Sequence, residues 1–261
     1  MGFLEEHIQS LEKKRRREER YPLLAVILIA SVVIAALFAI GWYSRERNVV
    51  VIPIEGELYT GAYSGGGVSG SEQVGKEIRS AADDALVEAI VLRVDSPGGS
   101  PAAAQEIIQD LQYARSKKPV VVSIGDLATS AAYYISAYAD RIYANPDSIT
   151  GGIGTVWIFT DISEWMQKEG YAITVVKSGE NKDMTYPYRT LSPDEERYAQ
   201  DIVDRSFERF VTDVTVQRNI SRNLIEDGRL YRGEEAKTMG LVDEMGNLQA
   251  AIEGARYLAS R

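Results

Sequence analysis

The sequence predicts an α/β domain preceded by one transmembrane helix, and two patterns carry this prediction. Residues 21–43 form an uncharged apolar run, and over 44–261 apolar β-branched segments alternate with segments of helical period. Two stretches, 88–114 and 119–139, repeat the order strand, glycine-containing turn, helix. Stacked β-β-α turns of a superhelical fold would produce that repetition, although a doubly wound sheet would look similar.

The apolar run at 21–43 is predicted to be a retained single-pass anchor in the cell membrane. At about 1.5 Å per residue it can cross a hydrocarbon core of about 30 Å. Tyr21, Trp42 and Tyr43 stand at its two ends, where amphipathic rings favour the membrane interface. A cleaved signal peptide and a buried helix are the alternatives. The run is longer than a typical signal-peptide apolar region, and no small-x-small cleavage site follows it.

The flanking charges predict the orientation of this anchor. Six basic residues precede the run within 1–20, whereas only Arg45 and Arg47 follow it closely. Positively charged flanks stay in the cytoplasm. We therefore expect a cytoplasmic basic tail at 1–20, the transmembrane helix at 21–43 and an extracytoplasmic domain at 44–261.

Composition excludes several kinds of function. The chain has no cysteine, which excludes thiolate catalysis and disulfides, and its single histidine, His7, lies in the tail. Residues 45–261 carry 23 basic and 33 acidic residues, a poor balance for contacting nucleic-acid phosphates. We expect no nucleic acid partner, and no metal, nucleotide or organic cofactor is implied.

The first half of the domain begins with an apolar strand at 48–58, interrupted by Pro53 and Gly56. A glycine- and serine-rich loop should follow it. Ser100 as the expected N-cap and Pro101 at the first helical position indicate the start of a helix. The full series reads as a loop at 59–70, a helix at 71–87, a buried strand ending in a glycine turn at 88–99 and a helix at 100–118.

In the second half, the strand at 119–126 runs through a Gly125-Asp126 turn into a helix that begins near Ser130. A long helix is expected from Pro193 to about Asn219. Between and after these lie a short strand at 140–146, a strand, helix and strand over 150–180, a short strand, helix and turn over 228–248, and a closing amphipathic helix.

Ser130 stands where a strand and turn give way to a helix. Such a position exposes a hydroxyl at the positive end of the helix dipole, near N–H groups that have no partner within the helix. Gly98 and Gly99 could supply one oxyanion donor and the Ala131 N–H the other. The structural alternatives are a helix cap at Ser130 and an ordinary glycine turn before a helix.

A serine nucleophile needs a base, and without a usable histidine lysine is the best remaining type. A lysine serves only if burial lowers its pKa from about 10.4 toward neutrality. Five of the seven domain lysines are expected on polar helix faces or in a surface turn. Lys177 should end a strand and Lys182 should lie in the loop after it, and periodicity does not separate these two. The seven are Lys76, Lys117, Lys118, Lys168, Lys177, Lys182 and Lys237.

Four stretches over residues 48 to about 247 resemble the signal peptide peptidase A (SppA) family, in the family's order: "VLRVDSPGG", "TSAAYYISAYADRIYANPDSITGGIG", "KSGENKDMTYPYRTLSPDEER" and "GRLYRGEEAKTMGLVDEMG". This family comprises membrane-anchored serine proteases with a Ser/Lys dyad on a ClpP/crotonase-like fold, a β-β-α superhelix. The resemblance implies that Ser130 is the nucleophile, that Lys182 is the general base and that Gly98 and Gly99 form the oxyanion loop.

One departure from the family concerns the residues after the nucleophile. The family usually has Gly-Gly there, and this chain has Ala131-Ala132. Two added methyl groups could narrow the site or alter the geometry of its donors. This departure is also the one hint of a catalytically silent scaffold.

The resemblance implies a serine endopeptidase that cleaves hydrophobic peptides, such as signal peptides left in the bilayer. It also implies a ring-shaped homo-oligomer in which neighbouring chains supply serine and lysine. Two further alternatives are the membrane protease group encoded beside stomatin-like proteins and a crotonase-type acyl-CoA enzyme. The extracytoplasmic placement argues against the acyl-CoA enzyme, because CoA esters are cytoplasmic.

Overall fold

The computed structural model describes residues 2–43 and 48–261, which form two units that divide between Arg47 and Asn48. The N-terminal unit is helix α1, Gly2–Tyr43, and its side chains are described at 2, 5–11, 13–15 and 26–38. Among the residues whose side chains are described, no helix is long and apolar enough to cross a membrane. Much of the predicted span, 21–25 and 39–43, lies outside those side chains.

A mainly parallel sheet organises residues 48–261, which confirms the α/β class. Its strands follow the order β2-β1-β3-β4-β5-β8, with every neighbouring pair parallel. A short extension adds β6, parallel to β4, and β7, antiparallel to β6. The strands are β1 Asn48–Tyr59, β2 Val68–Gly70, β3 Val87–Gly99, β4 Val120–Thr129, β5 Arg141–Ala144, β6 Ile149–Gly151, β7 Leu230–Arg232 and β8 Glu244–Met245.

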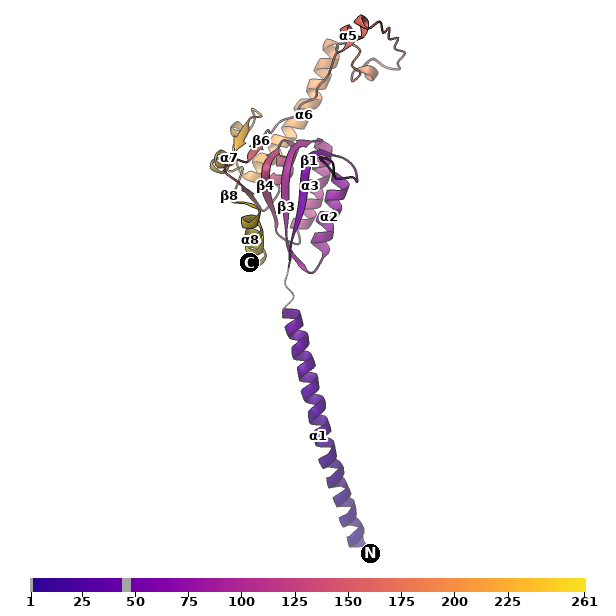
Figure 1. The fold of residues 1–261 in the computed structure, drawn as a ribbon, viewed down its shortest axis with the longest axis vertical. Coiled ribbons are helices and arrows are strands. Elements are labelled where there is room, and N and C mark those ends of the chain that lie inside the picture. Colours follow the sequence, from indigo (N-terminus) through magenta and orange to yellow (C-terminus); the bar gives the residue numbers. More distant parts are fainter. Residues whose placement is uncertain (1, 44–47) are drawn as a thin grey trace. The chain divides into compact units, whose positions relative to one another are not determined.

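Helices cover both faces of this sheet (Figure 1). Successive residues of a strand point to opposite faces, and in the middle of β3 residues 89–92 are fully buried on both faces. Ile90 and Leu92 join the larger core beneath α2, α3 and α4, whereas Ala89 and Val91 pack toward α8. The helices are α2 Ser71–Asp83, α3 Pro101–Arg115, α4 Ala131–Ala137, α5 Ser163–Lys168, α6 Pro193–Arg218, α7 Gly233–Met239 and α8 Leu248–Ala259, with 3₁₀ turns η1 Glu180–Asp183 and η2 Arg222–Leu224.

Strand β1 continues through both residues that were expected to interrupt it. Pro53 is in register with Arg93 of β3. Gly56, which has a positive φ, lies in a bulge between Glu55 and Glu57, so the strand continues past it. On its other side β1 pairs with β2 only at Glu57–Tyr59. Proline is tolerated in such a strand because its missing N–H can face the open side.

Strand β4 is longer than predicted and contains no turn at Gly125-Asp126. It runs to Thr129 because Leu127–Thr129 pair with β6, a partner that local sequence does not reveal. The serine therefore follows the strand directly.

The expected strand before Lys177 is wrong. Residues 171–177 have no regular secondary structure, and their apolar side chains, such as those of Tyr171, Ile173 and Val176, are exposed. A strand needs a neighbour to pair with, and the described part of the chain supplies none there. The 150–180 stretch keeps only the short β6 and α5.

Helix α6 begins with a capping box between Ser192 and Glu195 and ends at Asn219, whose left-handed conformation closes it. Its far end lies away from the sheet, with α5 beside it, and its other end reaches the sheet (Figure 1). Near that second end Phe210 packs on Tyr134 of α4, with 4.6 Å between ring centroids. The helix thus joins the α5 region to the helix that follows Ser130.

Candidate functional site

Ser130 links β4 directly to α4 in a strained backbone conformation. Its φ of 53° and ψ of −126° lie outside the regions that residues with a side chain ordinarily occupy. The Ser130 N–H donates to the Gly151 carbonyl at 2.9 Å, and its own carbonyl accepts from the Tyr134 N–H at 2.9 Å. Ser130 occupies the N-cap position, but its hydroxyl makes no capping bond and has no hydrogen-bond partner among the described residues. The half-buried hydroxyl is uncommitted.

Two glycines at the end of β3 bring the backbone against this serine. A Cβ on Gly98 would lie 2.8 Å from the Ser130 Cβ and 2.9 Å from the Ala131 nitrogen. A Cβ on Gly99 would lie 2.2 Å from the Leu58 carbonyl oxygen. Both glycines also have positive φ. The structure therefore brings together Gly98, Ser130 and Ala131, as the sequence predicts.

The candidate oxyanion donors differ in whether their N–H groups already donate a hydrogen bond. The Gly98 N–H donates to Ser96 Oγ at 3.1 Å, and the Ser96 hydroxyl donates to the Gly56 carbonyl at 2.5 Å. Ala131 opens α4, and its N–H has no acceptor within the described residues, as first-turn amides usually lack one. Ala132 is fully buried in the core, so only the Ala131 methyl group can narrow the site.

A cavity of about 20 Å³ adjoins Ser130. None of the residues that line it offers a ready base. The Tyr134 phenol donates to Asp213 and burial raises its pKa far above neutrality, and Arg209 is a cation. The lining residues are Gly99, Pro101, Gln105, Ser130, Ala131, Tyr134, Gly154, Thr155, Ser206, Arg209 and Phe210. Within one described chain, the base is missing from this cavity.

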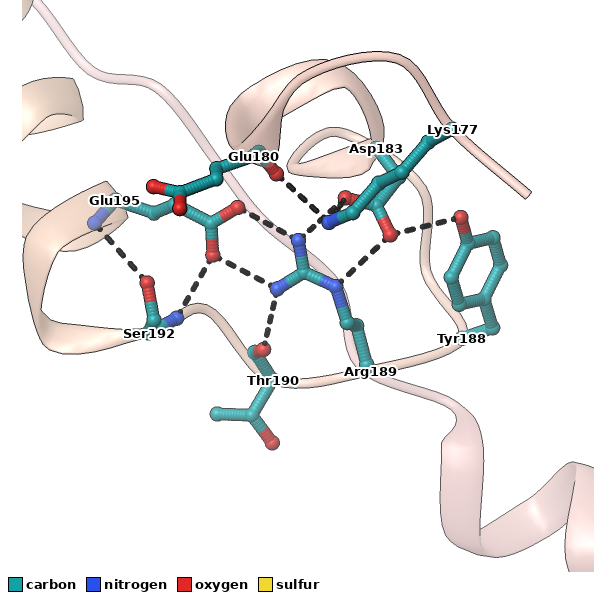
Figure 2. Close-up of polar contacts among 8 residues, drawn as sticks. All are labelled: Lys177, Glu180, Asp183, Tyr188, Arg189, Thr190, Ser192 and Glu195. Atoms are coloured by element: carbon teal, nitrogen blue, oxygen red, sulfur yellow. Dashed lines mark hydrogen bonds and ion pairs between the residues drawn. The ribbon is translucent and has the colours of Figure 1, made fainter. Parts of the chain in front are cut away.

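The two lysines that the sequence leaves open differ in their bonding. The Lys177 ammonium donates to Asp183 Oδ1 at 2.6 Å and to the Glu180 carbonyl at 2.7 Å (Figure 2). Lys182, in η1, is exposed, and its side chain forms no hydrogen bond or ion pair with any described residue. Lys177 would have to leave two acceptors before acting as a base, whereas Lys182 is free.

An ion-pair network surrounds the residue that follows Lys182. Figure 2 shows Arg189 between Asp183 and Glu195, with Arg189 Nη2 2.6 Å from an oxygen of each carboxylate. Hydrogen bonds from Arg189 and Lys177 hold the pKa of Asp183 below its usual range. Hydrogen bonds from Arg189 and the Ser192 N–H lower the pKa of Glu195 to about 2. Sequence reasoning missed this network, although the Ser192–Glu195 capping spacing was a readable signal for its anchor.

No contact in the described structure joins Lys182 to Ser130. Asp183 is tied through Arg189 to Glu195 in the first turn of α6, whereas Phe210 contacts the helix after Ser130. Fifteen residues of straight helix between Glu195 and Phe210 span about 22 Å. That separation exceeds the reach of a lysine side chain, so one chain presents the two halves of the predicted dyad apart.

A second cavity, of about 420 Å³, adjoins the segment that carries Lys177 and Lys182, called the lysine-bearing segment below. Trp157, Phe159, Met184 and Tyr186 contribute apolar walls, and α6 contributes Ala199 and Val203. Its size lies within the range of small-ligand and side-chain sites.

The fold and the site describe an α/β protein with an uncommitted serine at a strand-to-helix junction and glycine backbone against it, as acyl-transfer sites require. The chain belongs to peptidase family S49, whose sequence model matches residues 112–260. That range contains both Ser130 and Lys182.

Individual relatives agree with this assignment. Protease 4 of Salmonella typhi is 35% identical over 81% of this chain and 35% of its own length. A protein of Enterococcus faecium, provisionally named signal peptide peptidase SppA, is 33% identical over 69% of this chain and 54% of its own. The chain thus spans about a third to a half of these relatives.

A membrane-bound stomatin-specific protease has a similar solved structure. It aligns with a TM-score of 0.52 and 17% identity, covering 78% of this chain and 83% of its own. This likeness concerns the fold.

Proposed function

We propose that the protein is a membrane-anchored serine endopeptidase that uses a Ser130/Lys182 dyad. The observation that carries this proposal is the uncommitted Ser130 hydroxyl, held in a strained turn against Gly98. Membership of family S49 agrees with peptide-bond hydrolysis. It also sets aside the acyl-CoA alternative, since the relatives are named as proteases.

In the proposed reaction the neutral Lys182 amine removes the Ser130 proton while Oγ attacks the peptide carbonyl carbon. The carbonyl oxygen becomes an oxyanion, which accepts from the Ala131 N–H and from the Gly98 N–H once that group leaves Ser96 Oγ. The C–N bond then breaks, and the lysine ammonium gives its proton to the departing amine. Water, deprotonated by the same lysine, hydrolyses the acyl-serine and restores the hydroxyl.

The lysine of each site comes, in this proposal, from a neighbouring copy in a ring-shaped homo-oligomer. Two observations favour this arrangement. The cavity at Ser130 lacks a base, and α6 separates the lysine-bearing segment from Ser130 within one chain. The exposed apolar residues Tyr171, Ile173 and Val176 provide surface that a neighbour could cover.

We further propose that the substrates are hydrophobic peptides, such as remnant signal peptides. The cavity beside the lysine-bearing segment has a mixed polar and apolar lining, and its aromatic side chains, Trp157 and Phe159, suit such chains. One relative bears a signal peptide peptidase name. The fold neighbour makes stomatin-like tails the rival substrate. A panel of both peptide types would separate the two.

The dyad is tested by substitution in the full-length protein. Ser130→Ala and Lys182→Ala should each abolish hydrolysis of an apolar reporter peptide, and Ser130→Ala should also abolish labelling by a fluorophosphonate. Wild-type activity should rise along an alkaline limb set by the lysine. Near-normal turnover of Lys182→Ala would reject the dyad and make Lys177 the next residue to test.

We propose that α1 anchors the protein, with residues 1–20 in the cytoplasm and 44–261 outside the cell membrane. The exposed apolar side chains on all sides of α1 between Val26 and Phe38 favour a lipid environment, and the six preceding basic residues favour this orientation. Protease added to intact protoplasts should digest 44–261. Protection of that domain, with cleavage of the tail, would reverse the topology.

A further inference from the structure

The residue next to Lys182 is the most heavily bonded carboxylate of its segment. Asp183 has a side chain only 7% exposed. Its two carboxylate oxygens accept hydrogen bonds from four side-chain donor atoms: Arg189 Nη2 at 2.6 Å, Arg189 Nε at 3.1 Å, Lys177 Nζ at 2.6 Å and the Tyr188 hydroxyl at 3.1 Å. Because Asp183 is covalently adjacent to Lys182, these bonds fix the backbone from which the lysine projects.

Arg189 connects this carboxylate to a rigid element. Its guanidinium binds Asp183 on one side and, through Nη1 and Nη2 at 2.7 and 2.6 Å, the carboxylate of Glu195 on the other (Figure 2). Glu195 is only 5% exposed and also accepts from the Ser192 N–H at 2.9 Å in the capping box. A planar guanidinium suits two such bidentate contacts, and an ammonium cannot reproduce them.

The segment has little else to hold it. Residues 169–179 lack regular structure and are exposed, and η1 is a single 3₁₀ turn. The Lys182 N–H makes one long bond, 3.4 Å, to the Gly179 carbonyl. A general base must nevertheless be held within hydrogen-bond reach of its proton, and supporting contacts provide that precision.

We propose that Arg189 is a positioning residue for Lys182: by joining Asp183 to Glu195 it fixes the lysine-bearing turn to the first turn of α6. Lys177 is then a structural cation of the same network. This inference rests on the proposed function, in which Lys182 is the base. It adds that the base is held by an arginine that acts through Asp183 and does not touch the reacting atoms.

The test compares Arg189→Met and Arg189→Lys with wild type in the full-length protein, using an apolar reporter peptide. A base displaced by about 1 Å costs about a hundredfold in rate. Arg189→Met should therefore lose about a hundredfold in kcat with little change in KM. Its alkaline limb should move to higher pH, because a lysine that is no longer held at the proposed boundary with a neighbouring copy stays in solvent. Arg189→Lys should recover only part of kcat.

Arg197→Met is the matched control, because Arg197 lies near the start of α6, close to Glu195, and its pair with Asp194 is exposed. It should leave kcat and the pH profile unchanged. If Arg189→Met folds poorly, Glu195→Gln loosens the same anchor more gently and should shift the limb in the same direction. An unchanged limb, with activity falling only in proportion to the folded fraction, would overturn the inference.

Lys182→Ala distinguishes this inference from the proposed function. Activity in Lys182→Ala would remove the base assignment itself, whatever Arg189→Met does. Loss of activity in Lys182→Ala together with wild-type kcat and pH profile in Arg189→Met would keep the dyad and reject the positioning role.

Discussion

At the scale of single residues, Ser130 and Lys182 share one property: both side chains lack a polar partner in the described chain, although their neighbours are tightly bonded. Gly98 packs against Ser130, and Asp183 is bound by four donor atoms. Neither side chain has to break a bond to a protein partner before it could react, and the fixed neighbours hold the backbone that carries it. The lack of a bonded partner distinguishes Lys182 from Lys177, whose ammonium donates to Asp183 and to the Glu180 carbonyl.

The carboxylates of the network lead to a prediction for acid stability. Hydrogen bonds from Arg189 lower the pKa of Glu195 from 4.5 to about 2 and that of Asp183 below 3.8. Both groups bind a proton less readily when folded, so their contribution to stability is complete above the unfolded pKa values and is lost as pH falls through the folded ones. The wild-type advantage in Tm over Arg189→Met should be constant above about pH 5 and shrink toward pH 2.

Thermal melts of the two full-length proteins across this pH range check the prediction. Arg197→Met serves as the control, since its exposed ion pair should give no pH-dependent difference. A wild-type advantage that persists undiminished at pH 2 would contradict the assigned role of the two carboxylates.

At the scale of elements, local signals predicted best where they act locally. Ser100 and Pro101 begin α3 as expected, with the Ser100 Oγ accepting from the Ala103 N–H, and α6 begins at Pro193 and ends before Asn219. Caps, a fixed proline φ and helical period are properties of neighbouring residues, so one sequence reveals them. The serine at the start of α4 was predicted for the same reason.

Sequence-based prediction failed where residues far apart in the sequence determine the local structure. The end of β4 depends on β6, and the segment before Lys177 stays irregular because no described strand pairs with it. Its β-branched residues favour a strand only when a neighbour is present. Arg189 was missed because its two acceptors become a network only after η1 and α6 are placed.

At the scale of the whole molecule, the proposed dyad is divided between two places on the chain, one with the serine and one with the lysine. Mixing Ser130→Ala with Lys182→Ala under subunit exchange should therefore restore part of the activity, because some boundaries pair an intact serine with an intact lysine. The restored rate, measured with the reporter peptide against each variant alone, is the readout.

The same mixtures locate Arg189. Arg189→Met should complement Ser130→Ala, which supplies an intact lysine side, and should not complement Lys182→Ala. If subunit exchange between Ser130→Ala and Lys182→Ala is demonstrated and no activity returns, each dyad is built within one chain. The segment that carries Lys182 must then fold back to reach Ser130.

The outer edge of β1 bears on folding and aggregation, before any catalysis. Along most of its length the outer side of β1 pairs with none of the described strands, and its sequence "NVVVIPIEG" is among the most apolar in the domain. An open, apolar strand edge invites pairing with other chains and hence aggregation during synthesis and folding. Pro53, in the middle of that edge, removes a donor from any such foreign ladder. For a chain that forms the proposed ring, Pro53 therefore disfavours a competing contact through this edge.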